Sequence, residues 1–319
     1  MLIGSSLCFW PVVAVEALVG CFSGTAGTAL DIVKYTVAGG QPEVAARLSV
    51  RNSASEAVGA LLAASSLSVL DLSAGHAMGL AVAVEAALLC VILGAPSVNA
   101  QAATTTSPTP GADAPVVGWS AFMALWRLPL ERVHLIHAIF CIGAGGQLQR
   151  KMQFGAGGTA ANLAWMTCIG KLTYIAVAVF DLCPKAKRAL SVRTILASEP
   201  LGHSLALFMA VGPHANVPLL YAADLVKWSS LAVGDPVEEA YRVTAVQKAG
   251  LGVGTYRAVT RLWGSVCSLY QPALETALWA WHLDAPLLYS GTQFALSALQ
   301  IWWVVGRIES AKLKEKKVE

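Results

Sequence analysis

The sequence predicts an all-α integral membrane protein with amphipathic helices at the membrane interface, and three observations support this. Hydrophobic residues make up 56% of the 319 residues and charged residues only 13%, about half the charged share of an ordinary soluble chain. Lys and Arg are absent between Arg51 and Arg127, whereas a soluble domain needs mixed charges on its surface. No segment shows the sustained period-two alternation of strands, so helices are predicted throughout.

Composition divides the chain into four regions. The segment rich in Pro, Thr and Ala cannot bury enough apolar surface to fold alone, so it is predicted to be a linker. The predicted regions are an apolar and amphipathic helical region at 1–95, a Pro/Thr-rich linker at 96–118, a helical membrane region at 119–306 and a basic cytosolic tail at 307–319.

The N-terminal region contains three segments that are predicted to be helical. Residues 1–22 lack the basic start of a secretory signal and the Arg-rich character of a transit peptide, and Glu16 interrupts them. A membrane-embedded or interfacial helix is therefore predicted there rather than a cleaved leader. Residues 28–70 suit a helical hairpin whose second helix starts at Pro42. Residues 74–95 are apolar and long enough to span a membrane.

The first half of the helical membrane region is divided by Gly and Pro. Residues 143–158 contain the tetrapeptide GAGG twice. No Gly-Lys-Ser/Thr follows, so a turn or close helix packing is predicted rather than a phosphate loop. An apolar run follows at 163–183. Residues 201–223 are uncharged but include Pro213 and Pro218, which predicts a broken span or a buried hairpin.

The second half of this region carries a helix start and an amphipathic pattern. Asp235 and Pro236, followed by two acids in the first turn, predict that a helix begins there. Apolar and aromatic residues recur at helical spacing from Tyr256 to Tyr270. That helix is expected either to pack on neighbouring helices or to lie in the headgroup zone of a bilayer.

The clearest predicted membrane span covers residues 285–306. This run contains no charged residue and ends near Trp302 and Trp303, and tryptophan is enriched at membrane interfaces. Arg307 follows directly and marks the predicted exit from the membrane.

Few residues suggest chemistry, and the chain is predicted not to be an enzyme and to need no cofactor. Glu131, His134 and His137 lie at a spacing of three on one helical face, but a metal site would need a matching second helix. Buried or interfacial histidines are the favoured interpretation. The seven cysteines stand singly, without a CxxC motif. The net charge of +3 and the lack of a basic stripe exclude nucleic acid as a partner.

Charged residues inside apolar runs are costly in lipid and are therefore candidates for function. Those in the helical membrane region are Lys171, Asp181, Asp224 and Lys227, with Glu16 and Glu85 in the N-terminal region. Lys171 and Asp181 are expected near span ends, where Lys can extend to the headgroups. Asp224 and Lys227 are three residues apart and are expected to pair on one helix.

Two stretches of the chain resemble the peroxin-11 family of peroxisomal and glycosomal membrane proteins. Residues 22–64 are similar to its N-terminal pattern, a short helix ending in Lys34-Tyr35 and then an amphipathic helix led by Pro42 and Glu43. Residues 269–306 are similar to its closing pattern, an Asp followed by a terminal span with Gly and Ser. Together the stretches cover about a quarter of the chain.

The resemblance implies a non-enzymatic role in membrane elongation and organelle proliferation at the peroxisomal (glycosomal) membrane. A helix laid into one leaflet displaces headgroups and favours curvature. The candidate membrane-contact residues are Val44, Arg47, Leu48, Arg51, Val58 and Leu62.

The C-terminal tail carries a candidate trafficking signal. Lys316 and Lys317 occupy the fourth and third positions from the end, the dilysine pattern that coat proteins read on the cytosolic side of membranes, although a Lys-rich tail also contains such a pair by chance. The expected partners are the lipid bilayer, further copies of the chain or other membrane subunits, and coat or division machinery at the tail.

Two other functions fit the same composition. One is an accessory subunit of a mitochondrial inner-membrane complex, in which small-residue helices pack against partners. The other is a small transporter or channel that uses Glu85, Lys171 or Asp224.

Overall fold

The computed structural model describes residues 118–181 and 190–315, together with the single positions 61 and 65. Every regular element in the two long ranges is a helix, which confirms the all-α prediction for this part of the chain. The membrane-contact and trafficking candidates lie outside the described residues. These are Val44, Arg47, Leu48, Arg51, Val58, Leu62, Lys316 and Lys317.

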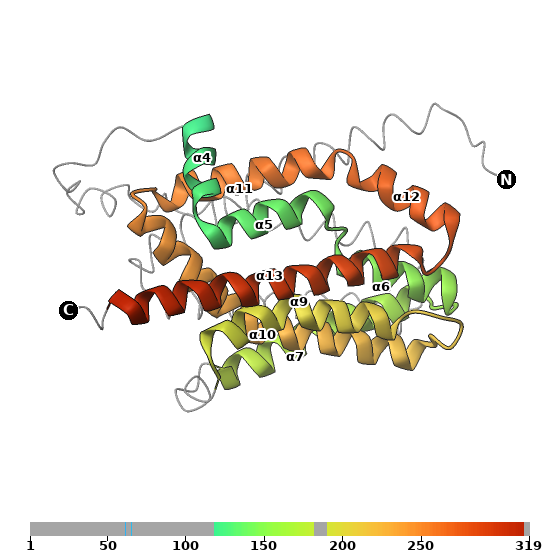
Figure 1. Cartoon of the computed structure of the whole chain (residues 1–319). Helices are drawn as coiled ribbons and strands as arrows, with labels where there is room; N and C mark the ends of the chain where they lie inside the picture. The colour runs from blue at the N-terminus through green and yellow to red at the C-terminus, as the bar shows by residue number, and fades with distance from the viewer. Residues whose placement is uncertain (1–60, 62–64, 66–117, 182–189, 316–319) are drawn as a thin grey trace, which may run out of the picture.

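Four long helices, α7, α9, α10 and α13, form the body of the described bundle. Helix α9 packs along α10 on one side and along α13 on the other, and α7 packs against α10. Helix α5 lies between α11 and α13 (Figure 1). The elements are α4 Trp119–Arg127, α5 Pro129–Phe140, α6 Ala144–Arg150, a π-helical turn Lys151–Gly155, α7 Ala160–Asp181, α9 Val192–Met209, α10 Val217–Lys248, α11 Val253–Ser268, α12 Gln271–Trp281 and α13 Ala285–Glu315.

Glycines allow these helices to approach closely. A Cβ atom added to Gly202 of α9 would lie 2.1 Å from Ser230 of α10, and one added to Gly170 of α7 would lie 2.1 Å from the indole nitrogen of Trp228. Small residues at such crossings bring two backbones together, as in the interfaces of membrane helices. Helices α7, α9 and α10 therefore depend on glycine for their spacing.

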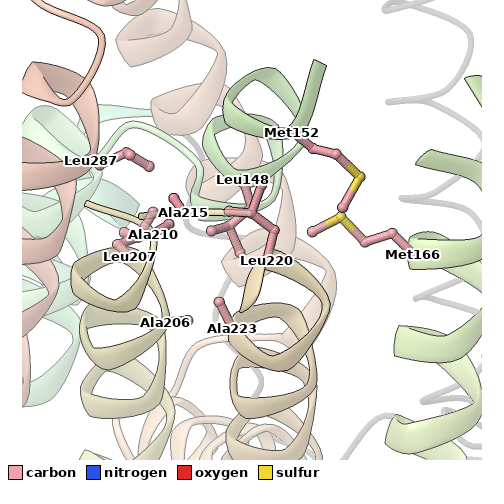
Figure 2. Packing of buried hydrophobic residues seen from close by; sticks show 10 residues of the cluster. All are labelled: Leu148, Met152, Met166, Ala206, Leu207, Ala210, Ala215, Leu220, Ala223 and Leu287. Atoms are coloured by element: carbon pink, nitrogen blue, oxygen red, sulfur yellow. The ribbon is translucent and has the colours of Figure 1, made fainter. Parts of the chain in front are cut away.

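The largest apolar core joins helices that are distant in sequence. In Figure 2 the Met152 and Met166 side chains point toward one another from the π-helical turn and α7, beside Leu148 of α6. The flexible thioethers of methionine fill irregular gaps between such elements. The cluster comprises Leu148, Met152, Met166, Ala206, Leu207, Ala210, Ala215, Leu220, Ala223 and Leu287.

Residues 201–223, predicted to be a broken span or a buried hairpin, form part of a helical hairpin, but Leu201 and Leu205 on its first arm are exposed. Helix α9 ends at Met209 and α10 begins at Val217. Gly212 supplies a positive φ of 97° in the turn, a conformation that glycine adopts without strain. The Asn216 side chain accepts a hydrogen bond from the Leu219 N–H at 3.0 Å and caps α10.

The helix start predicted at Asp235 is wrong, because Pro236 lies inside α10. The Asp235 carboxylate does not cap the helix but accepts a hydrogen bond from the Tyr174 hydroxyl of α7 at 3.1 Å. Pro236 and Gly234 are both buried against neighbouring helices. Tertiary packing therefore continues the helix through a residue that lacks the N–H donor.

Residues 285–306, predicted to span a membrane, are helical and belong to α13, but this helix is not apolar enough to cross a membrane. Within residues 118–181 and 190–315, no helix combines the length and the apolar character needed to cross a membrane. In α13 the apolar run is divided by Thr292, Gln293, Ser297 and Gln300. The helix also continues past Arg307 to Glu315, across the boundary predicted for the tail.

Candidate functional site

A cluster of ionisable side chains lies inside the bundle, where α5, α9 and α10 meet. Glu131 is 1% exposed and Glu238 9% exposed. Burial of an ionised group costs several kcal/mol unless the group is paired, and buried titratable groups gather at functional sites. This charged cluster consists of Glu131, His134, Glu199, Glu238 and Arg242.

Arg242 is the centre of the charged cluster. Its Nε and Nη2 atoms donate to the two Glu131 carboxylate oxygens at 2.7 and 2.9 Å. Its Nη1 atom donates to Glu238 Oε1 at 3.0 Å, one turn earlier on α10. The guanidinium also lies 5.6 Å from the ring centroid of Tyr256. This fork-shaped geometry fixes α5 against α10 and neutralises part of the buried negative charge.

Glu199 is a third carboxyl in the same environment. Burial raises its pKa well above the ordinary value, and the nearby Glu238 and Asp235 carboxylates raise it further, while Arg242 opposes them. The pKa of Glu238 is also raised, chiefly by burial, with Arg242 acting in the opposite direction. One guanidinium cannot neutralise every carboxylate around it, so Glu199 holds its proton to a higher pH than an exposed glutamate.

Two histidine environments adjoin the charged cluster. His134 Nε2 lies 3.3 Å from Glu238 Oε1, and burial and Arg242 lower the pKa of His134 well below 6.5. His137 and His203 both lie against Phe294, each with its ring centroid 5.0 Å from the phenyl centroid. Burial lowers the pKa of each of these two histidines to about 4. All three imidazoles are therefore neutral at physiological pH.

A separate ion pair lies further along α10. Asp224 and Lys227 form a salt bridge between side chains that are 4% and 8% exposed, which confirms the predicted pairing. Burial raises the pKa of Asp224, while Lys227 and the Trp228 indole oppose that shift. The ammonium of Lys171 lies 4.6 Å from the Trp228 ring centroid. The position near a span end expected for Lys171 is not found, since it lies mid-way along α7 against α10.

A largely apolar cavity of about 580 Å³ opens beside the charged cluster. Arg242, Glu131 and Lys248 are among the polar residues that line this cavity. The apolar lining includes Leu128, Pro129, Leu130, Val192, Val237, Tyr241 and Ile308. A pocket with apolar walls and a few fixed polar groups is the usual form of a small-molecule site.

The spacing of Glu131, His134 and His137 does not produce a metal centre. Glu131 is bound to Arg242, and His137 is turned toward Phe294. In the described ranges, no group of three or more His, Cys, Asp or Glu side chains is placed to hold a metal ion. Burial raises the pKa of the Cys141 thiol to about 12, so this thiol carries no reactive thiolate at neutral pH.

Sequence reasoning missed Arg242 and Glu199 and misread Glu238 as part of a helix start. The available signal was the i, i+4 spacing of Glu238 and Arg242, which favours an ion pair on one helix. Nothing in the sequence indicated that Glu131, more than a hundred residues earlier, completes the cluster.

The outer faces of α9 and α13 form a second feature, which we call the α9/α13 apolar face. The two helices are antiparallel, since Gly291 meets Phe208 near the end of α9 and Gly306 meets Arg193 near its start. The exposed fractions of Leu205 and Leu299 are 52% and 66%. The face comprises Leu201, Leu205, Phe208, Leu288, Leu296, Leu299 and Trp303.

The amphipathic helix predicted from Tyr256 is found as α11, and its apolar residues divide between two environments. Tyr256 is fully buried, and the Trp263 indole donates to the Leu135 carbonyl of α5 at 2.8 Å. Leu262 and Leu269 are 67% and 82% exposed. One part of the apolar pattern therefore packs on a neighbouring helix, which was one of the two arrangements expected for this segment. The other part faces outward.

Comparison of the chain with protein-family models, with curated proteins and with solved structures finds no match.

Proposed function

We propose that this protein is a non-enzymatic membrane protein that binds a lipid bilayer through the α9/α13 apolar face and promotes elongation of the peroxisomal (glycosomal) membrane. The first part of the proposal is supported by the described helices. The second part is supported by the resemblance of residues 22–64 and 269–306 to the peroxin-11 family.

One observation carries the proposal: the described helices hold charge inside and expose large apolar side chains outside. Glu131, Asp224 and Lys227 are buried. In contrast, more than half of the residue surface is exposed at Leu201 and Leu205 of α9 and at Leu299 and Trp303 of α13. In water, the opposite distribution is favoured, since buried charge is costly and large exposed apolar patches promote association. If lipid surrounds α9 and α13, their exposed apolar side chains are no longer in contact with water, and the cost of exposing them is removed.

The proposal is tested by flotation of the full-length chain with phosphatidylcholine vesicles. We expect the wild-type chain to float with the vesicles, and Leu205→Glu combined with Leu299→Glu to reduce the bound fraction about tenfold or more, since a carboxylate on the lipid-facing surface costs more than 1.4 kcal/mol. Gln247→Glu is the matched control, because this exposed residue near the end of α10 adds the same charge on a helix that contributes no residue to the face.

The flotation result shows whether the α9/α13 apolar face contacts lipid, and a separate experiment identifies the organelle. Equal binding of the wild-type chain and the double variant would show that the α9/α13 apolar face does not contact lipid. For the organelle, the chain with a fluorescent C-terminal tag is expected to coincide with a peroxisomal membrane marker and to lengthen the organelle when overproduced. Coincidence with a mitochondrial inner-membrane marker would favour an accessory subunit of a complex there.

A small transporter or channel is a second candidate, and the buried ionisable groups favour it. Asp224, Lys227, His203 and Glu199 follow one another along the contact between α9 and α10, and Lys227 lies close enough to His203 to lower its pKa. Chains of titratable groups inside helical bundles serve as ion or proton pathways. Proton uptake into liposomes that Glu199→Gln abolishes would support this function, and no uptake by the wild-type chain would exclude it.

A further inference from the structure

A groove of about 630 Å³ lies where the first turn of α9 meets the C-terminal half of α13. Two arginines and two tryptophans define it, and Gly306 forms part of its floor. We call this site the Arg–Trp groove. Its lining residues are Arg193, Trp302, Trp303, Gly306, Arg307, Ser310 and Ala311.

Each arginine of the groove is stacked on a tryptophan. The guanidinium carbon of Arg193 lies 4.1 Å from the Trp302 ring centroid, and that of Arg307 lies 4.3 Å from the Trp303 centroid. Stacking uses the flat face of a guanidinium and leaves its N–H edge available for an anion. The two stacks therefore orient two cationic donors in one groove.

Arg193 is partly buried and Arg307 is exposed. Neither arginine has an acidic partner among the described residues, whereas the buried cations Arg242 and Lys227 are paired. The Nε atom of Arg193 is buried and has no hydrogen-bond partner in that part of the chain. Unsatisfied buried donors are rare and call for a ligand or a water. The groove therefore holds two cationic side chains that have no acidic partner in the described ranges, and one of them carries a buried, unsatisfied N–H group.

The fold holds Arg193 in place by two means. A Cβ atom at Gly306 would lie 2.8 Å from Arg193 Nη1, so glycine is needed there for the guanidinium to lie against α13. Arg193 also lies in the first turn of α9, whose N-terminus is capped by the Ser191 side chain at 3.2 Å from the Thr194 nitrogen. The partial positive charge of a helix N-terminus adds to the field of the two arginines.

The groove is continuous with the α9/α13 apolar face. Trp303 belongs to both, and Leu299 and Leu296 precede it by one and two turns on the same helix. From Leu288 to Trp303 the face extends over about 22 Å at 1.5 Å per residue, more than the roughly 15 Å of one hydrocarbon leaflet. Acyl chains along this face would place a headgroup phosphate at the groove.

We infer that the Arg–Trp groove binds the phosphate of an anionic phospholipid headgroup, with the acyl chains on the α9/α13 apolar face. The inference rests on the proposed membrane binding and names the class of lipid that this surface selects. A lipid is favoured over free phosphate, because the apolar face adjoins the two arginines directly and a free ion would leave it uncovered.

The test compares flotation of the full-length chain with phosphatidylcholine vesicles and with vesicles that also contain phosphatidylserine. We expect phosphatidylserine to strengthen binding of the wild-type chain. Arg193→Gln and Arg307→Gln should each weaken binding to the acidic vesicles about fivefold, and together about 25-fold, without changing binding to phosphatidylcholine alone. Arg132→Gln is the matched control, an exposed arginine on α5.

Two further variants keep the test decisive. Arg307 is exposed, so Arg307→Gln reports on the groove even if Arg193→Gln disturbs folding, which circular dichroism monitors. Arg307→Lys keeps the charge but loses the planar fork. We expect it to restore less than half of the lost affinity, and full restoration would show that the stacked geometry is not used.

The outcomes separate this inference from the proposed function. Binding to phosphatidylcholine without any preference for phosphatidylserine, or an equal loss with Arg132→Gln, would overturn the inference and leave the apolar membrane contact standing. Displacement from acidic vesicles by inorganic phosphate, but not by chloride at the same ionic strength, would assign the groove to free phosphate instead. Failure of the wild-type chain to float with either vesicle would overturn both proposals.

Discussion

Replacement of Arg242 by Met is expected to destabilise the bundle strongly. The substitution removes the only cation that is bonded to both Glu131 and Glu238 in the charged cluster, and Glu131 is 1% exposed. Removal of one partner from a buried ion pair costs about 3–5 kcal/mol, since the remaining charge is buried without compensation. For a domain of this size each kcal/mol lowers Tm by about 2–4 °C, so a decrease of about 6–20 °C is expected.

The assay is thermal unfolding of the purified chain, followed by circular dichroism. The double variant with Arg242→Met and Glu131→Met should recover about 1–3 kcal/mol relative to the sum of the single effects, because the unpaired carboxylate is removed together with its partner. Arg132→Met is the control, since Arg132 is an exposed arginine on the same helix as Glu131, and a change of about 0.5 kcal/mol or less is expected for a surface substitution. Additive single effects, or a loss no larger than that of the control, would refute the reasoning.

Two further predictions concern pH and helix packing. His137 and His203 have a pKa of about 4 in the folded chain and about 6.5 when unfolded, so the unfolded chain binds more protons between these values and stability should fall as pH drops from about 6.5 toward 4. Denaturation midpoints across this range should show that loss, and Gln at both positions should flatten it; an unchanged slope would contradict the assigned protonation. Gly202→Ala should destabilise the bundle by about 1–3 kcal/mol because its Cβ would meet Ser230, whereas Gly264→Ala in α11, where no atom lies within 4 Å of the added Cβ, should stabilise it by about 0.5–1 kcal/mol. Equal effects of the two glycine variants in urea denaturation would show that the α9–α10 contact is looser than described.

The sequence predicted structural features correctly where they depend on residues that are close to one another in the chain. Pro213 and Pro218 interrupt an apolar run, and a hairpin forms there. Asp224 and Lys227 lie one turn apart and pair. The apolar recurrence from Tyr256 onward forms α11. In each case the interacting residues are separated by no more than a few turns.

Predictions failed where residues of distant segments determine the energy of a local feature. Pro236 carries the local signal of a helix start, yet α10 passes through it, because burial against neighbouring helices outweighs the loss of one backbone hydrogen bond. The prediction of a membrane span over residues 285–306 failed for a local reason instead: the run lacks charge, but polar residues such as Gln293 and Gln300 leave α13 too polar to cross a membrane.

The sequence by itself determined that residues 118–181 and 190–315 fold as helices, because hydrophobic periodicity acts on every segment independently. Only the tertiary structure decided that Glu131 and Arg242 meet inside the bundle and that Arg193 and Arg307 lie over two tryptophans of α13. The position of a charge relative to its partner depends on how α5, α9, α10 and α13 pack. That packing is a property of the whole fold, which no local pattern encodes.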